Sequence, residues 1–170
     1  MPDYAALLRG VSPMNATMAG LKAAFEKAGF DEVRTVLGSG NVVFRTTSRS
    51  LPAIEKRAEE FLQKHLGRTF MTLVRPIPEL QRILDSDPYK GFSLRSGSKR
   101  VVTFLRGRAP KTPLPPEKDG ARIYAVLGAE VFSAYVSSPK GPVFMALLEK
   151  TFGKDITTRT WESVAKIVRS

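Results

Sequence analysis

The stretch VRTVLGSGNVVF, from Val33 to Phe44, decides the fold because it predicts two strands joined by a tight turn. Strands are expected over residues 32–37 and 41–46, where β-branched and apolar residues are frequent. The segment Gly38-Ser39-Gly40 lies between them, and its glycines accept the positive φ angles that tight turns require. The stretch therefore predicts an antiparallel hairpin.

Helical patterns flank this hairpin on both sides. Upstream, apolar residues recur at helical spacing over 18–28, behind the capping residue Thr17. Downstream, residues 51–66 form an amphipathic segment with its charges opposite its apolar side. Apolar runs over 4–9 and 69–75 supply the outer strands. The resulting order, β-α-β-β-α-β, is the ferredoxin-like arrangement.

The second half is less regular. Its expected elements are a helix over Pro76–Leu84, a strand over Arg100–Leu105, a proline-rich connector over Pro110–Pro116, a hairpin around Gly128-Ala129, a helix over Pro142–Phe152, and a last helix capped by Thr160. The fold class is therefore expected to be α+β, with two packed ferredoxin-like subdomains of which the second is irregular. The predicted division is residues 1–75 for the first half and 76–170 for the second, which forms one compact unit with the first.

Composition narrows the function classes. The chain has 170 residues, a net charge of +11 and no cysteine. The missing cysteine excludes disulfides, thiolate nucleophiles and cysteine-based zinc sites, and it favours a reducing cytoplasm. No run is long and apolar enough to cross a bilayer, and the opening MPDYAALLRG lacks the basic region of a secretory signal. A cytoplasmic protein that does not engage a membrane is expected.

The positive charge is concentrated in one stretch. Between Pro88 and Pro116 there are seven bases and no acid, namely Lys90, Arg95, Lys99, Arg100, Arg106, Arg108 and Lys111. Such a field attracts polyanions, and nucleic acid is the usual one. Five of the bases are the nucleic-acid candidates: Arg95, Lys99, Arg100, Arg106 and Arg108. The alternative is a well-solvated surface.

Three segments resemble the bacterial family known as domain of unknown function (DUF) 1697. They are LLRGVSPMN at 7–15, the stretch at 33–44 and TTRTWESVAKI at 157–167. The resemblance implies two packed ferredoxin-like subdomains and no established biochemical role. This chain departs from the family where Arg-Gly is usually followed by Ile-Asn-Val-Gly-Gly, because it has Val-Ser-Pro-Met-Asn there, and where Gln often precedes Ser-Gly-Asn, because it has Gly38. The family ending Thr-Arg-Asn-Trp-Asn-Thr is also altered, so a site shared at these segments is in doubt here.

The turn Gly38-Ser39-Gly40-Asn41 has two interpretations. A dinucleotide loop is excluded, because it needs a third glycine and a following helix, whereas this turn has Val43 and a strand. A tight hairpin is the first interpretation. The second is a small anion nest made by the successive N–H groups of Ser39, Gly40 and Asn41.

Two further segments are candidates for anion binding. Arg9-Gly10 follows the first strand, where the guanidinium either holds a phosphate or carboxylate or braces the loop. Thr158 and Arg159 are expected at the opening of the last helix, where N–H groups, hydroxyls and a guanidinium suit an anion. The alternative there is that Thr160 only caps the helix and Trp161 anchors it in the core.

Other polar residues indicate no chemistry. His65, the single histidine, is expected at a helix boundary, and Asp85 and Asp87 are expected to end a helix and begin a turn. No catalytic residue, cofactor or metal is predicted.

Three functions remain as hypotheses. The first is an anion-binding module for nucleic acid or a nucleotide, which uses the basic face. The second is a small phosphometabolite-binding protein or enzyme with a site between the halves, drawing on Arg9, Asn41 and Arg159. The third is a non-catalytic scaffold or regulatory protein.

Overall fold

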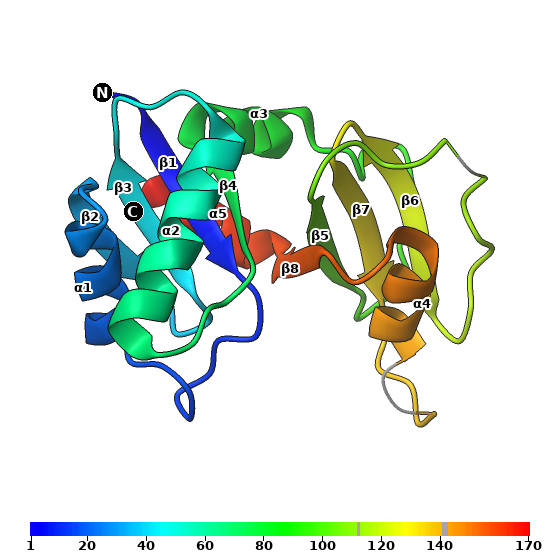
Figure 1. Cartoon of the computed structure of the whole chain (residues 1–170). Coiled ribbons are helices and arrows are strands. Elements are labelled where there is room, and N and C mark those ends of the chain that lie inside the picture. The colour runs from blue at the N-terminus through cyan, green and yellow to red at the C-terminus, as the bar shows by residue number, and fades with distance from the viewer. Residues whose placement is uncertain (112, 141–142) are drawn as a thin grey trace. The chain divides into compact units, whose positions relative to one another are not determined.

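The computed structural model describes residues 1–111, 113–140 and 143–170 (Figure 1). Its contacts divide the chain into two units, Met1–Asp85 together with Ala165–Ser170, and Ser86–Val164. This division falls later than the predicted boundary between residues 75 and 76, and it groups the last residues with the first unit. Thr112 of the expected connector and Pro142 of the expected helix lie outside the described residues.

The first unit has the predicted β-α-β-β-α-β order, followed by one more helix. Its elements are β1 (Asp3–Leu8), α1 (Met18–Lys27), β2 (Asp31–Val36), β3 (Asn41–Arg45), α2 (Leu51–Leu66), β4 (Thr72–Pro76) and α3 (Ile77–Ser86). The strands form one antiparallel sheet in the order β2-β3-β1-β4. Helices α1 and α2 cover one face of this sheet (Figure 1).

The helix ends follow from local sequence. Thr17 caps α1 by accepting a hydrogen bond from the Gly20 N–H at 3.0 Å. Ser50 caps α2 in the same way, with the Ala53 N–H at 3.3 Å. Gly67 ends α2 at φ 75°, a left-handed conformation that glycine adopts without a steric penalty. The predicted start of α1 and end of α2 are thereby confirmed.

Helix α2 is less simply amphipathic than the sequence predicted. Glu55 is buried, and its carboxylate accepts a hydrogen bond from the Val74 N–H at 2.8 Å. Glu59 accepts one from the Thr72 N–H at 3.0 Å. Strand β4 is an edge strand, so these carboxylates satisfy N–H groups that no further strand pairs. His65, expected at the boundary, is exposed.

The second unit repeats this sheet without its first helix. Its elements are β5 (Lys99–Leu105), β6 (Ala121–Leu127), β7 (Glu130–Tyr135), α4 (Val143–Phe152), β8 (Ile156–Thr160) and α5 (Trp161–Arg169), of which the last turns belong to the first unit. The strand order β6-β7-β5-β8 matches the order of the first sheet. The connection over 106–120, where the counterpart of α1 would stand, contains no helix among its described residues. The α+β fold with an irregular second half is confirmed.

Strand β8 corrects one prediction. Thr158 and Arg159 were expected at the opening of the last helix, but they pair with Thr103 and Val102 of β5. The β-branched threonines favour an extended backbone, and β5 offers them an unpaired edge. The helix begins afterwards, at Trp161, with Thr160 as its predicted cap.

Two remaining observations concern the polar pattern. The Asp87 carboxylate accepts a hydrogen bond from the Tyr89 N–H at 3.1 Å, so the turn predicted after α3 is present. Within the described part of the chain, no helix has the length and low polarity needed to cross a membrane.

Candidate nucleic-acid interface

The structure brings together the first two sets of anion-binding candidates, both in the first unit. The Leu8 N–H donates to the Gly40 carbonyl at 2.9 Å, so Arg9 and Gly10 begin beside the β2–β3 turn. Gly40 has φ 87°, and a Cβ there would lie 2.8 Å from a methyl group of Val11. The loop after β1 and the turn therefore touch, and glycine is required at their contact.

Asparagine side chains form hydrogen bonds within both the turn and the loop. The buried Asn41 amide donates to the Val36 carbonyl at 2.9 Å and to the Ser39 hydroxyl at 3.0 Å. In the neighbouring loop, the Asn15 amide donates to the Gly10 carbonyl at 2.8 Å and its carbonyl oxygen accepts from the Ser12 N–H at 2.9 Å. The hairpin interpretation of the turn is thus confirmed, while the anion nest stays a prediction.

Thr158 and Arg159 belong to the second unit, where Arg159 is buried. Its guanidinium donates to the Thr157 hydroxyl at 2.8 Å and to the Thr158 carbonyl at 2.7 Å. Burial lowers the pKa of Arg159 to about 10. Only 7 % of the residue is exposed, so little of this guanidinium is accessible to an anion in solvent.

Arg159 has a counterpart in the first unit. Arg75 is also buried, at 6 % exposure, and it holds the same place in β4 that Arg159 holds in β8, one residue before the strand ends. One residue separates each arginine from the helix that follows, with Ile77 opening α3 and Trp161 opening α5. This short repeat is visible only after the strands are matched, and it indicates a structural role for both guanidinium groups.

The basic stretch does not form one surface. Lys99 and Arg100 open β5, whereas Arg106 and Arg108 follow its other end. Arg100 and Arg106 are six residues apart along the chain, so about 20 Å of extended strand separates their backbones. The seven bases therefore divide into two groups at opposite ends of the second sheet.

An aromatic cluster lies at the Lys99 end. Its centre is Tyr89, whose hydroxyl contacts the Ser133 carbonyl at 2.7 Å and the Val101 carbonyl at 2.9 Å. The Tyr89 ring meets the rings of Trp161 and Tyr124 edge-on, at centroid distances of 5.4 and 6.1 Å. Burial raises the pKa of Tyr89 well above its ordinary value, so the phenol stays neutral and remains a donor.

Two arginines cover this cluster. Arg100 lies over the Trp161 ring at 5.2 Å, and Arg122 lies over the Tyr124 ring at 4.6 Å and the Phe92 ring at 5.7 Å. Both arginines pair in register with Ala134 of β7, so they flank a small residue on the same face of the sheet. The two strand spacings between them correspond to about 10 Å.

The outer part of the cluster is open to solvent. Phe92 is 39 % exposed, Arg122 is exposed and Tyr124 is half-buried. These three residues, hereafter the aromatic patch, lie on the sheet face opposite α4, because the next residue of β6, Ile123, packs in the core beneath that helix. A nucleobase can stack on the solvent-facing side of such a cluster of a guanidinium and two rings.

Two of the predicted nucleic-acid candidates besides Arg100 lie in the segments next to this patch. Lys99 is exposed at the start of β5, but it pairs with Tyr135 and therefore belongs to the α4 face of the sheet. Arg95 is exposed, with its guanidinium paired to Glu117 at 2.8 Å. Phe92, Arg122 and Tyr124 were not predicted. The available signal was the placement of Tyr89 and Phe92 within the acid-free stretch, since aromatic residues among bases are typical of single-strand binding surfaces.

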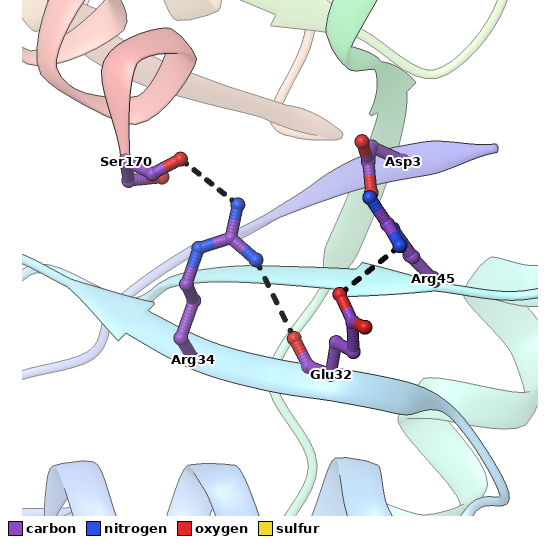
Figure 2. Close-up of polar contacts among 5 residues, drawn as sticks. All are labelled: Asp3, Glu32, Arg34, Arg45 and Ser170. Atoms are coloured by element: carbon purple, nitrogen blue, oxygen red, sulfur yellow. Dashed lines mark hydrogen bonds and ion pairs between the residues drawn. The ribbon is translucent and has the colours of Figure 1, made fainter.

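A second charged group lies on the first unit (Figure 2). Arg45 pairs with Asp3 at 2.6 Å and with Glu32 at 3.2 Å, and the hydrogen bond and charge of Asp3, followed by the charge of Glu32, raise the pKa of Arg45. Beside them, Arg34 donates to the main-chain oxygens of Glu32 at 3.5 Å and Ser170 at 2.9 Å. The charges compensate one another, so this group anchors the end of the chain to β2 and offers no surplus charge to a ligand. In the described ranges, no three metal-ligating side chains gather.

Comparisons with known proteins agree with this architecture. The family model described as "Protein of unknown function (DUF1697)" matches residues 1–132. A solved structure of the conserved bacterial protein SP0830 from Streptococcus pneumoniae is similar, with a TM-score of 0.73 and 20% sequence identity over 99% of this chain and 97% of that chain. No curated protein matches. At this identity the structural likeness shows the fold alone.

Proposed function

The chain belongs to the DUF1697 family of proteins of unknown function, and we propose that it binds single-stranded nucleic acid through the aromatic patch of its second unit. The observation that carries the proposal is the exposed stack of Arg122 on Tyr124 and Phe92. Neighbouring bases, Arg100 and Arg95, would contact the phosphates. A cytoplasmic setting is part of the proposal, and the absence of cysteine supports it.

The geometry favours unpaired bases over a duplex. Stacking on an aromatic side chain needs a base whose face is free, and each such contact contributes about 1–3 kcal/mol. RNA-recognition domains use the open face of a four-stranded ferredoxin-like sheet in this way. Here the patch occupies an edge of that face, at β6, rather than its middle, where Phe132 and Phe104 are buried. One or two stacked bases are therefore expected.

The electrostatics supply the remaining affinity. Arg122 is an exposed cation, Arg100 is a half-buried one on the same face of the sheet, and Arg95 can exchange Glu117 for a phosphate because both partners of that pair are partly exposed. Each phosphate neutralised on a single strand contributes about −0.7 to the slope of log affinity against log salt. Three such contacts give a slope near −2, which is a moderate salt dependence.

Fluorescence anisotropy with labelled single-stranded RNA, single-stranded DNA and duplex DNA tests the proposal. Phe92→Ala should weaken single-strand binding by roughly five- to 100-fold without changing the salt slope, because it removes a stack and no charge. Arg100→Gln should reduce the slope by about 0.7. Lys166→Gln, at an exposed lysine of α5, is the matched control and should bind as the unmodified protein does.

The outcomes separate the hypotheses. Absence of binding at low salt, or equal binding by Phe92→Ala, would refute the proposal. A phosphometabolite site drawing on Arg9 and Arg159 would instead give thermal stabilisation by one small phosphorylated compound, nearly independent of salt. A scaffold would give neither response.

A further inference from the structure

Among the described residues, one helix covers the α4 face of the second sheet, whereas two helices cover the corresponding face of the first sheet. Four strands about 4.8 Å apart make a sheet wider than the roughly 10 Å that one helix covers. In the first unit, α1 and α2 together cover one face of the sheet, and residues of both helices pack in one core. In the described part of the second unit, α4 alone contributes helical residues to the core on that face.

The connection between β5 and β6 covers part of the remaining face. Ala109 packs against the core beneath it, which includes Ala121, Ile123 and Val131. The rest of the connection is rich in proline and has no regular structure among its described residues beyond one bridge between Lys118 and Ala121. An extended chain is thinner than a helix, so covering the sheet this way leaves unfilled space beside α4.

That space is a groove of about 760 Å³ between the connection and α4. Its lining residues are Pro113, Pro115, Pro116, Glu117, Lys118, Asp119, Val143, Ala146, Leu147, Lys150 and Thr151. Proline rings form one wall, and aliphatic side chains of α4 form the other. Proline has no N–H to donate, so the walls offer apolar surface and few hydrogen bonds. The volume lies within the range of small-molecule sites.

The acidic residues of the groove are paired with bases, whereas two of its lysines are not paired with acids among the described residues. Glu117 is paired with Arg95 at 2.8 Å, and Asp119 is paired with Lys140 at 3.1 Å. Arg95 and Lys140 are not among the residues that line the groove. Lys118 and Lys150 are exposed, and neither ammonium has an acidic partner among the residues that the structure describes. The groove therefore presents apolar walls with uncompensated positive charge.

We propose that this groove binds an amphipathic carboxylate, a saturated chain of about eight to twelve carbons that suits a site of this size. The chain would lie along the prolines and the α4 side chains, and the carboxylate would meet Lys118 or Lys150. The groove lies on the α4 face and the aromatic patch lies on the opposite face of the same sheet, but the Arg95–Glu117 pair belongs to both, so decanoate binding is measured without nucleic acid.

Calorimetric titration with sodium decanoate, below its micelle concentration, tests this site. Octanoate and decanol are the matched ligands: removal of two methylenes should weaken binding by about tenfold, and loss of the carboxylate by a similar factor. The paired change Lys118→Gln with Lys150→Gln should also weaken decanoate binding about tenfold, whereas Lys166→Gln should leave it unchanged. Ala146→Trp should abolish binding, because the indole fills the groove from an exposed position without entering the core.

Retained circular dichroism and melting temperature identify variants that still fold, so loss of binding can be assigned to the site. Absence of saturable decanoate binding, equal affinity for decanol, or undiminished binding by Ala146→Trp would overturn the proposal. Sedimentation distinguishes a macromolecular occupant: a dimer that Ala146→Trp dissociates would show that a second copy fills the groove, and this result would also overturn it.

Discussion

Replacement of Tyr89 by phenylalanine removes one oxygen and leaves the ring in place. The residue is 4 % exposed, and its hydroxyl contacts the Val101 and Ser133 carbonyls at 2.9 and 2.7 Å. Both carbonyls lie inside the second sheet, where water does not readily replace the lost donor. The Val101 carbonyl keeps the Ser133 hydroxyl as a donor at 3.3 Å, whereas the Ser133 carbonyl loses the Tyr89 hydroxyl, and a buried acceptor deprived of a donor costs about 1–3 kcal/mol. We therefore expect Tyr89→Phe to lower the free energy of unfolding by about 2 kcal/mol at pH 7.

This difference should shrink at alkaline pH. Burial raises the pKa of Tyr89 in the folded protein, whereas the unfolded phenol ionises near its ordinary value of about 10. Above pH 10 the unfolded state therefore binds fewer protons than the folded state, and the contribution of Tyr89 to stability falls as pH rises. The fall is between about 1 and 2 kcal/mol at pH 11, so the two proteins should become nearly equal in stability between about pH 11 and 12.

Urea unfolding of both proteins, followed by circular dichroism at pH 7, 9, 10 and 11, measures the difference directly. The two proteins differ only at residue 89, so contributions from the rest of the chain cancel in the difference. A cost at pH 7 below about 0.5 kcal/mol would show that the hydroxyl is not needed by those carbonyls. A difference that stays constant from pH 7 to 11 would refute the raised pKa.

Three further changes probe packing and anchoring. Leu148→Ala, at a fully buried residue of α4, should cost about 2–5 kcal/mol in urea unfolding. Gly40→Ala should lower the free energy of unfolding by about 2 kcal/mol or more, because φ is 87° and a Cβ would lie 2.8 Å from a neighbouring side chain. Gly38→Ala is the matched control: it has open space around it and should change that free energy by less than about 0.5 kcal/mol. Arg34→Ala should speed amide exchange at the end of α5, because the hydrogen bond to Ser170 is lost; unchanged exchange there would remove the anchoring role.

Local patterns were sufficient for most of the fold. The Gly38–Gly40 turn, the Thr17 cap and the Gly67 stop each depend on neighbouring residues, and all three are present. Strand β8 was missed because its burial depends on tertiary contacts. From its charge alone Arg159 is expected at the surface, and its buried place in the edge strand β8 follows only from pairing with β5.

The candidate interface was less accessible to sequence reasoning. The charge run drew attention to Arg95, Lys99 and Arg100, but charge alone does not reveal which rings lie beneath a guanidinium. Arg122 and Phe92 are far apart in sequence. They meet because the loop before β5 brings Phe92 to the face of the sheet on which the Arg122 side chain lies. Periodicity reports which residues share one element, not which elements meet.

The grouping of Ala165–Ser170 with the first unit has a consequence for how the protein is made. The second unit, Ser86–Val164, is in effect inserted into the first, which is completed only by the last residues of the chain. Synthesis of the first unit is therefore interrupted by the whole of the second unit, so its last residues are added only after residues 86–164 have been made. Breaking the chain after Asp85 would leave residues 1–85 without the Ala165–Ser170 segment that completes their unit, so this fragment should be less stable than the same residues in the intact chain.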